Sequence, residues 1–289
     1  MAELAPGAHT FGFVWSCDAA DAVARLAAVG VRQFQLMGMA PHLDPWTPDP
    51  ARLAQLRATV AACGGEVLAI DLPSSDSNLA SLSPRTVDAS VALYTQALEV
   101  GAAVGARWLT INSGRSHALL PPPDDRLRDI FRGALVRLVA AAEARGMRIL
   151  IENIPGMVLP DARSLRTFLD QDDHGLVDVL YDVANAAAIG EDPVAGMETL
   201  GERIRVLHLS DAPRGAWRHD PIGSGGIDFP AILRTARRLR YDGAVVLEII
   251  GADPLAAFCE SRARILALSV TPPASPRPIA ARSNPHAAA

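Results

Sequence analysis

The chain has 289 residues, and all 27 residues counted as lysine or arginine are arginine. The absence of lysine excludes enzymes whose chemistry needs a lysine amine, namely Schiff-base aldolases, pyridoxal-phosphate enzymes and P-loop phosphotransferases. The 32 acidic residues outnumber the arginines and give a net charge of −5. A dedicated nucleic-acid-binding protein usually carries a basic excess, so nucleic acid is a disfavoured partner.

The cysteines and the hydropathy of the chain bear on its compartment. Cys17, Cys63 and Cys259 lie far apart and form no CxxC pair, which argues against a disulfide framework and a thiolate zinc site. The N-terminal segment MAELAPGAHTFGF has neither the basic nor the long apolar part of a signal peptide. No apolar run approaches the roughly 20 residues that span a bilayer. We therefore expect a soluble cytoplasmic protein without a membrane partner.

Short apolar runs alternate with longer amphipathic stretches along the chain. The runs predict strands at residues 10–15, 31–37, 66–72, 107–112, 148–153, 177–182, 204–209 and 244–250. The stretches between them predict helices, for example at residues 48–62, 84–104, 125–145 and 229–239. Several of these helices begin with a capping residue followed by proline and are followed by glycine.

The order of these elements predicts the fold. The later strands are continuous apolar runs, as expected for parallel strands covered on both faces. Eight strand–helix units in about 270 residues match a single-domain α/β protein with a (β/α)8 TIM-barrel fold. A doubly wound sheet is the alternative, but no GxGxxG follows the first strand. We assign residues 1–268 to the barrel and residues 269–289, rich in proline and alanine, to a flexible tail.

Four consecutive predicted strands end in residues that can bind metal: Glu152, Asp182, His208 and Glu248. In an α/β barrel the carboxyl ends of the strands converge on the mouth, where chemistry takes place. Singly, each residue could be a helix cap, half of an ion pair or a core histidine. Together, three carboxylates would repel one another unless arginine or a metal compensates their charge. The set suits Mn²⁺ best, with Mg²⁺, Co²⁺ or Zn²⁺ as alternatives.

Sequence segments around these residues resemble a known family. They are IENIPG at 151–156, LYDVANAAAIGEDP at 180–193, VLHLSDA at 206–212, and PIGSGGIDFPAIL through YDGAVVLEII at 221–250. The chain is similar in these segments to the xylose-isomerase-like TIM-barrel superfamily of sugar phosphate isomerases and epimerases, which also includes AP endonucleases. The resemblance extends to about residue 268 and does not name a substrate.

The resemblance implies that Glu152, Asp182, His208 and Glu248 bind one divalent metal. It also implies that Glu152 and Glu248 act as acid–base groups on opposite sides of an α-hydroxy carbonyl substrate. The metal would stabilise the enediolate formed when a carboxylate removes the proton next to the carbonyl. Proton return to the opposite face gives epimerisation, return to the neighbouring carbon gives isomerisation, and loss of a β-hydroxyl gives dehydration.

Other polar residues near the predicted site are candidates for substrate binding. Arg218 and His219 follow strand seven, where the family often places an arginine that contacts substrate oxygens; the alternative is a solvated loop charge. Asp211 can orient His208, bind substrate or cap its loop. Asn185 stands where many sugar epimerases have histidine, so it can bind a hydroxyl but cannot be an acid or a ligand. The GSGG at 223–226 can bind a phosphate through its N–H groups or simply lead into a helix.

Two departures from the family pattern narrow the prediction. The second strand carries Gln35, where the family often has an acid. The AP-endonuclease branch needs several more histidines for its three-metal cluster, and the remaining ones are not arranged like that set: His9, His42, His117, His174 and His286. A nuclease is therefore disfavoured. The substrate is left open, because it depends on loops after strands one to four that contain Trp15, Trp46, Asp71 and Asn112.

We arrive at three hypotheses. The first is a divalent-metal-dependent isomerase or epimerase of a sugar, sugar phosphate or cyclitol ketone, with a small polyhydroxy carbonyl compound as substrate. The second is a metal-dependent dehydratase of the inosose or dehydroshikimate type. The third is a non-catalytic binding protein on the same barrel. Barrels of this size often form homodimers through their helices, and the sequence leaves this open.

Overall fold

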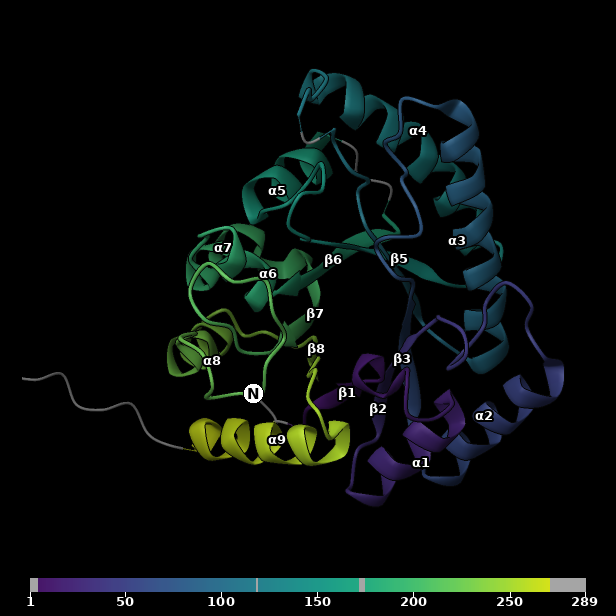
Figure 1. The fold of residues 1–289 in the computed structure, drawn as a ribbon. Coiled ribbons are helices and arrows are strands. Elements are labelled where there is room, and N and C mark those ends of the chain that lie inside the picture. Colours follow the sequence, from purple (N-terminus) through teal and green to yellow (C-terminus); the bar gives the residue numbers. More distant parts are fainter. Residues whose placement is uncertain (1–4, 118, 172–174, 271–289) are drawn as a thin grey trace, which may run out of the picture.

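The computed structural model describes residues 5–117, 119–171 and 175–270 and forms a closed parallel barrel (Figure 1). The strands pair in chain order, and the last pairs with the first, so the predicted (β/α)8 barrel is confirmed. The strands are β1 (Gly7–His9), β2 (Gln33–Met37), β3 (Glu66–Asp71), β4 (Trp108–Ile111), β5 (Arg148–Glu152), β6 (Val177–Asp182), β7 (Ile204–Leu209) and β8 (Ala244–Leu247).

Helices surround the barrel and connect successive strands (Figure 1). Many begin at an aspartate or serine whose side chain accepts a backbone N–H of the first turn, as Asp49 and Ser83 do. Their bounds are α1 (Ala19–Ala28), α2 (Pro50–Ala62), α3 (Pro84–Val104), α4 (Asp124–Glu143), α5 (Ala162–Gln171), α6 (Val183–Ala188), α7 (Pro193–Leu200), α8 (Phe229–Arg238) and α9 (Pro254–Val270). Short 3-10 turns lie at Phe11–Phe13 and Gly201–Arg203.

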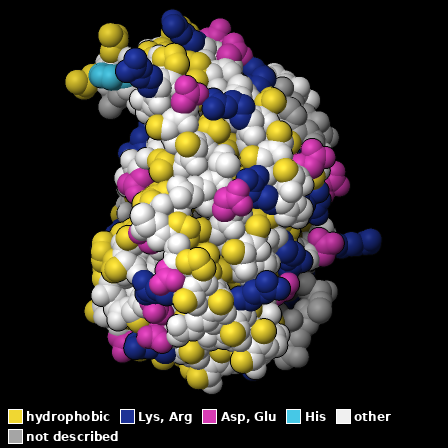
Figure 2. Space-filling view, turned by 90° about the vertical axis from the view of Figure 1, so that its right-hand side faces the viewer, with side chains coloured by type: hydrophobic (Ala, Val, Ile, Leu, Met, Phe, Trp, Pro, Cys, Tyr) yellow, Lys and Arg dark blue, Asp and Glu magenta, His cyan; other side chains and the backbone are white. Residues whose placement is uncertain are grey.

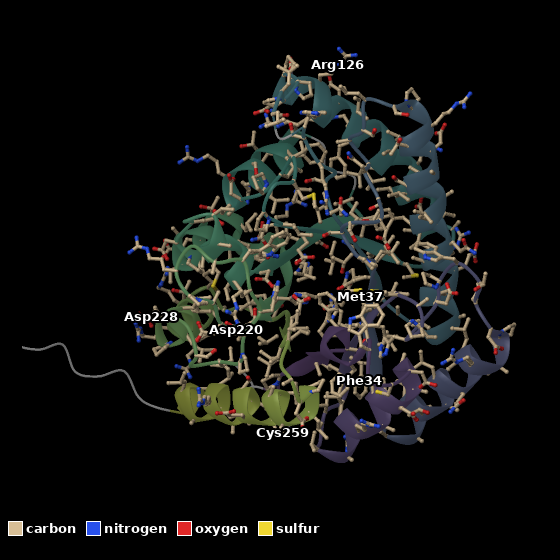
Figure 3. The ribbon with its side chains drawn as sticks, viewed as in Figure 1. Phe34, Met37, Arg126, Asp220, Asp228 and Cys259 are labelled. Atoms are coloured by element: carbon tan, nitrogen blue, oxygen red, sulfur yellow. The ribbon has the colours of Figure 1, made fainter. Side chains whose placement is uncertain are left out.

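The core has two layers, one inside the barrel and one between the barrel and the helices. A larger cluster fills the outer layer, and it includes Phe34 of β2 (Figure 3). The inner layer consists of one buried side chain from each of β3, β5, β6, β7 and β8: Leu68, Leu150, Leu180, Val206 and Val246. Side chains of a strand alternate between its two faces. In β5 to β8, the residue two positions after each inner-layer side chain therefore also faces the interior, one layer closer to the mouth. This periodicity places the four candidate ligands above an apolar floor.

The first strand differs from the prediction of residues 10–15. The structure places β1 at Gly7–His9, and the apolar run FGFVW begins in a 3-10 turn, with Phe13 N–H donating to Thr10 O. The position of β1 is determined by its backbone pairing, because β1 hydrogen-bonds to β2 on one side and to β8 on the other. Gly7 permits this close approach, because a Cβ there would lie 2.8 Å from Gln33 O. The shift brings His9 to the mouth of the barrel.

A β-bulge in β3 changes which of its side chains face inward. Phe34 pairs with Val67, but the next residue, Gln35, pairs with Ala69, so Leu68 is an extra residue in β3. Two successive residues of a bulged strand face the same side, and the alternation restarts beyond them. As a result, Ile70 packs outward near Gly101 of α3, and Asp71 faces the interior.

The remaining predicted boundaries agree with the structure to within a few residues, and β6, β7 and α3 coincide with the predicted ranges. The predicted tail begins inside the last turn of α9, and residues 271–289 lie outside the described residues. Arginines and acidic residues are interspersed on the outer surface near α3 (Figure 2), where Arg137 pairs with Asp88. Within the described ranges, no helix has the length and hydropathy to cross a bilayer.

Candidate metal centre

The four strand-end residues meet at the mouth of the barrel. Glu152, Asp182, His208 and Glu248 each offer one ligand atom, and these atoms all lie within 4.8 Å of one another. Each residue comes from a different one of the strands β5 to β8 or directly follows it, so the side-by-side pairing of these strands creates the cluster. Asp182, His208 and Glu248 are buried, and Glu152 is half-buried.

Asp182 has one carboxylate oxygen engaged and one free. Its Oδ1 accepts the backbone N–H of Asn185 at 2.7 Å and thereby caps α6. Asn153 fixes the Asp182 backbone, since its amide exchanges hydrogen bonds with the Asp182 N–H and C=O. Asp182 Oδ2 is buried and has no hydrogen-bond partner. Buried polar atoms are normally satisfied, so an unpartnered carboxylate oxygen that faces other ligands is typical of a cation site.

His208 presents a defined nitrogen to the cluster. Its Nε2 lies 2.8 Å from Gln35 Oε1, and an amide oxygen only accepts, so Nε2 carries the hydrogen. Gln35 is fixed in this orientation because its amide Nε2 donates to Asp71 Oδ2. His208 Nδ1 is thus the nitrogen that faces the cluster, 3.1 Å from Glu248 Oε2 and 3.6 Å from Asp182 Oδ2; it donates to Glu248 when protonated and offers a lone pair to an ion when that proton is lost. A metal-ligating histidine is commonly oriented in this way through its other nitrogen.

Burial and charge shift the pKa values in this cluster. Burial raises the pKa of Glu152 well above its ordinary value, and the charge of Glu248 raises it further. Burial alone would lower the pKa of His208, but the nearby carboxylates of Asp182 and Glu248 raise it well above its ordinary value. Burial alone would raise the pKa of Glu248, but positive charge at His219 and the hydrogen bond from His208 lower it well below its ordinary value. The carboxylates thus draw positive charge to the mouth.

The donor set fits a divalent cation. Three carboxylates and one imidazole provide hard oxygen ligands with a single nitrogen, as Mn²⁺ and Mg²⁺ sites do. The unpartnered Oδ2 of Asp182 and Nδ1 of His208 lie 3.6 Å apart across the shared space. These residues can therefore hold one ion while the helix cap and the Gln35 hydrogen bond keep two of them in place.

The structure separates the two neighbouring candidates of the loop after β7. His219 Nδ1 lies 3.3 Å from Glu248 Oε2 and 3.6 Å from Asp182 Oδ2, so His219 joins the cluster. Arg218 is 60% exposed and pairs with Asp220, the loop residue labelled in Figure 3, rather than with the cluster. The backbone explains this difference, because His219 O accepts the Ile250 N–H and pulls His219 against the end of β8.

Asn185 connects the cluster to an aromatic residue that sequence analysis did not single out. Its amide Nδ2 donates to Glu152 Oε1 at 3.0 Å, and its Oδ1 accepts the indole N–H of Trp217 at 2.7 Å. Trp217 belongs to the same loop as His219 and is half exposed. Sequence alone offers one signal for it, a tryptophan directly before two candidate residues, but the loop conformation decides its contact.

Asp211 braces its loop and does not contact the cluster's histidines. Its carboxylate accepts backbone N–H groups from Ala212, Gly223 and Ile227. Gly225 packs so closely on Asp211 and Ala212 that a Cβ would overlap them. The N–H groups of Ser224 and Gly226 donate to carbonyls of the same loop. Among the alternatives left open by the sequence, the geometry therefore favours loop capping for Asp211 and a structural lead-in for the GSGG turn.

A second group that sequence analysis did not assemble lies beside the cluster, on β1 to β3. His9, Gln35 and Asp71 are all buried, and both His9 and Gln35 hydrogen-bond to Asp71 Oδ2. The His9 ring lies edge-on to the His208 ring, with centroids 5.5 Å apart. The sequence gives only a weak signal for this group. The predicted first strand begins after His9, and Asp71 is predicted only to lie in a loop at the mouth.

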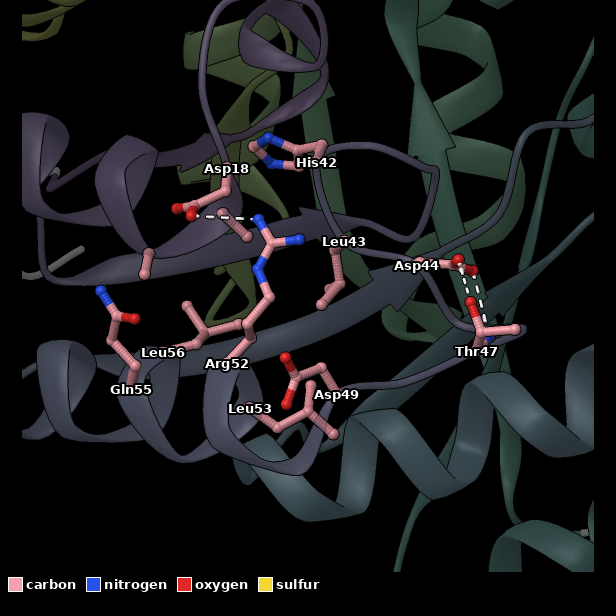
Figure 4. A pocket seen from close by; sticks show the side chains of 12 residues that line it. Asp18, His42, Leu43, Asp44, Thr47, Asp49, Arg52, Leu53, Gln55 and Leu56 are labelled. Carbon is pink, nitrogen blue, oxygen red and sulfur yellow. Dashed lines mark hydrogen bonds and ion pairs between the residues drawn. The ribbon is translucent and has the colours of Figure 1, made fainter.

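A separate hollow lies between the N-terminal ends of α1 and α2 (Figure 4). Its volume of about 40 Å³ leaves room for only a few water molecules. Its polar side chains bond one another, as Arg52 does with Asp18 and Thr47 does with Asp44. His42 lines it and bonds Thr10 and the Cys17 carbonyl. This hollow is therefore a packing feature.

Fold and site together define a (β/α)8 barrel with a candidate divalent-metal centre at the carboxyl ends of its last four strands. The model of the xylose isomerase-like TIM barrel family matches residues 23–267. The chain therefore belongs to this family.

Individual relatives are more distant. The chain is 26% identical to the inosose dehydratase of Geobacillus kaustophilus over 136 residues, which cover 39% of this chain but only 42% of that protein. It is 23% identical to the ketose 3-epimerase of Arthrobacter globiformis over 222 residues, which cover 75% of this chain and 73% of that protein. The crystal structure of a D-tagatose 3-epimerase-like protein superposes with a TM-score of 0.80 at 20% identity, covering 92% of this chain and 98% of the other, and shows the shared fold.

Proposed function

We propose that this protein is a divalent-metal-dependent isomerase or epimerase of a polyhydroxy carbonyl compound, a sugar, sugar phosphate or cyclitol ketone. The observation that carries the proposal is the convergence of Glu152, Asp182, His208 and Glu248 within 4.8 Å at the barrel mouth. The names of relatives support the substrate class, since the ketose 3-epimerase aligns along most of the chain.

The side chains divide the work as follows. Glu152, Asp182, His208 and Glu248 would hold the ion. Their hard oxygen donors suit Mn²⁺. When bound, the ion would polarise the carbonyl and hydroxyl oxygens of the substrate and stabilise negative charge on them. Glu152 and Glu248 are the acid–base pair: one carboxylate takes the proton from the carbon next to the carbonyl, and the other carboxyl group supplies a proton.

The surrounding residues keep this pair in position. Asn185 donates to Glu152 Oε1 and restrains its orientation, while its own oxygen is held by Trp217. His208 and His219 flank Glu248 Oε2. The buried position of Glu248 and the half-buried position of Glu152 restrict the access of water to the reacting carbon.

The test is exchange of solvent deuterium into the α-carbon of ketoses, measured by mass spectrometry with the Mn²⁺-loaded protein. We expect Glu152→Gln and Glu248→Gln to lower exchange by roughly 100- to 10,000-fold, the usual contribution of general acid–base catalysis. Glu198→Gln is the matched control, because Glu198 lies on the outer helix α7 and pairs with Arg238. Exchange near the wild-type rate in either active-site variant would contradict the acid–base assignment.

A dehydratase is the second candidate, favoured by the similarity to an inosose dehydratase over 39% of this chain. The same acid–base pair would remove an α-proton, but a β-hydroxyl would then leave. Incubation with inososes or dehydroshikimate would yield an enone or aromatic product that absorbs in the ultraviolet. Absorbance growth without recovery of a carbonyl isomer would favour this candidate over the isomerase.

A further inference from the structure

Two buried polar atoms on neighbouring strands lack hydrogen-bond partners within the described residues. They are Oδ1 of Asp71, at the end of β3, and Oγ1 of Thr110, on β4. The residues are 6% and 3% exposed, so bulk water does not satisfy these atoms. Nearly all buried polar groups in proteins are paired, and two unpaired groups beside a catalytic mouth point to a missing partner.

The two atoms belong to one wall of the barrel interior. The bulge at Leu68 turns Asp71 inward. Ala69 pairs with Trp108 and Ile70 with Leu109, so the register continues to place Asp71 beside Thr110. Trp108 packs with the inner core layer, which puts Thr110, two residues on, on the interior face as well. On the other side, Thr110 pairs with Leu150, two residues before Glu152.

The hydrogen bonds at Asp71 leave Oδ1 available. The Phe11 N–H donates to His9 Nδ1 at 2.9 Å, so His9 Nε2 carries the hydrogen and donates to Asp71 Oδ2 at 2.6 Å. Gln35 donates to the same oxygen at 2.5 Å. Two donors therefore fix the carboxylate through Oδ2, and Oδ1 remains a pre-oriented acceptor.

We propose that Asp71 Oδ1 and Thr110 Oγ1 bind a substrate hydroxyl that lies beyond the carbons undergoing proton transfer. The hydroxyl donates to Asp71 and accepts from Thr110, and the pair selects polyhydroxy chains over short ketones. This assignment rests on the proposed function of the same site. It adds specificity-determining residues from β3 and β4, the two strands that precede the ligand-bearing strands β5 to β8 in the barrel.

Deuterium exchange into two probes tests the pair: D-tagatose, which has hydroxyls beyond the reacting carbons, and dihydroxyacetone, which has none. The quantity compared is the ratio of their kcat/KM values in each Mn²⁺-loaded protein. Thr110→Val keeps the side-chain shape and removes the hydroxyl, and we expect the ratio to fall roughly 10-fold. Asp71→Asn places an NH2 group at the free position, and we expect a fall of roughly 100-fold.

Two controls separate specificity from folding. Thr95→Val removes a hydroxyl on the outer helix α3, where it bonds Val91 O, and should leave the ratio unchanged. Mn²⁺ affinity, measured by electron paramagnetic resonance, should stay within about threefold of wild type in Thr110→Val, because Thr110 is not one of the four candidate ligands. If Asp71→Asn fails to fold, Thr110→Val alone decides the outcome.

The outcomes distinguish this assignment from the function on which it rests. A lower ratio in the folded variants supports it. If the wild-type protein exchanges the probes but the ratio is unchanged in Thr110→Val, the two atoms serve packing or hold a water molecule, and the assignment is overturned. If the wild-type protein exchanges neither probe, nor other ketoses such as L-ribulose and D-fructose, the proposed function is contradicted and the assignment with it.

Discussion

The two ends of the barrel handle buried charge in opposite ways. At the amino end of β6, Asp178 is almost fully buried, and its Oδ2 lies 2.8 Å from an Arg148 nitrogen and 3.3 Å from Arg205 Nε. At the carboxyl end of the same strand, Asp182 is also buried, but its charged or chargeable neighbours are histidines and other carboxylates. Four residues along one strand separate a compensated carboxylate from an uncompensated one.

The two ends differ in whether the neighbours of the buried carboxylate are permanent cations. The arginines at the lower end are permanent cations, so Asp178 is neutralised at every physiological pH. At the mouth, within the described ranges, the partners of Glu152, Asp182 and Glu248 are an amide and two imidazoles, which are not permanent cations. A cluster left in this state costs stability and is retained where it binds something.

The largest expected effect is a loss of Mn²⁺ affinity when Asp182 is replaced by asparagine, compared with the same replacement of Asp178. Asp182→Asn keeps the α6 cap, because an amide oxygen still accepts the Asn185 N–H, but it removes one ligand charge. We expect Mn²⁺ affinity, measured by calorimetry, to fall by at least about 100-fold, more than the loss of an outer partner causes. Asp178→Asn should leave the affinity within about threefold and lower the free energy of unfolding by about 1–3 kcal/mol, a buried-pair loss reduced by the exposure of its arginines.

These two variants test whether the charge at the mouth acts locally on metal binding. Urea unfolding of the metal-free proteins measures the free energy of unfolding, and the far-ultraviolet circular dichroism spectrum shows whether each variant is folded. Loss of Mn²⁺ affinity in Asp178→Asn equal to that in Asp182→Asn would mean that the charge at the mouth is not locally determined.

The second effect is a dependence of stability on pH. Glu152 and His208 have raised pKa values in the folded metal-free protein, so both bind more protons folded than unfolded. Such groups contribute stability at low pH that is lost as pH rises. The loss begins near 4.5 for Glu152 and near 6.5 for His208, their ordinary pKa values. Glu248 has a lowered pKa, so its contribution to stability is lost as the pH falls below 4.5.

We therefore expect the thermal midpoint of the metal-free protein to fall as the pH rises above 6.5. Mn²⁺ should raise the thermal midpoint most at the upper end of the pH range. Protons and the ion compete for the same side chains, and fewer protons are bound there. Scanning calorimetry with and without Mn²⁺ measures both effects, and Glu152→Gln should flatten the part of the loss that begins near pH 4.5. A midpoint of the metal-free protein that climbs with pH would contradict the assigned directions.

The smallest effect sharpens the description of the mouth. Trp217→Phe removes the indole N–H that holds the Asn185 oxygen, so the Asn185 amide loses its restraint on Glu152. We expect kcat for deuterium exchange to fall roughly 2- to 10-fold, the value of one neutral hydrogen bond. Trp15→Phe is the control, since Trp15 is an exposed tryptophan on the loop after β1. Equal losses in both variants would indicate a general aromatic effect at the rim.

Much of the fold could be predicted because the strands of the second half are buried on both faces. VDVLYD and IRVLHL are apolar runs that stop at polar residues, and β6 and β7 begin and end where those runs do. The same property made Asp182 and His208 visible as strand-end residues. A local pattern sufficed there because burial of the whole strand leaves few alternatives.

The rest depends on pairing between distant segments, which no local pattern contains. β1 has three residues, and its partners β2 and β8 determine its place, so the apolar run after it was misleading. The bulge in β3 is invisible in EVLAID, because both faces of that strand are apolar. His219 reaches the cluster only because the loop folds back through paired hydrogen bonds between Asp211 and Asp220.

The extra residue at Leu68 has a consequence for how such barrels diversify. It sits in β3, with β4 between it and the ligand-bearing half, so gaining or losing one residue there re-aims Asp71 without moving Glu152 or His208. If Asp71 binds substrate as we propose, a change in the length of β3 would alter which substrates the mouth accepts. A lineage could thus exchange substrates through a single-codon insertion or deletion while it conserves the reaction.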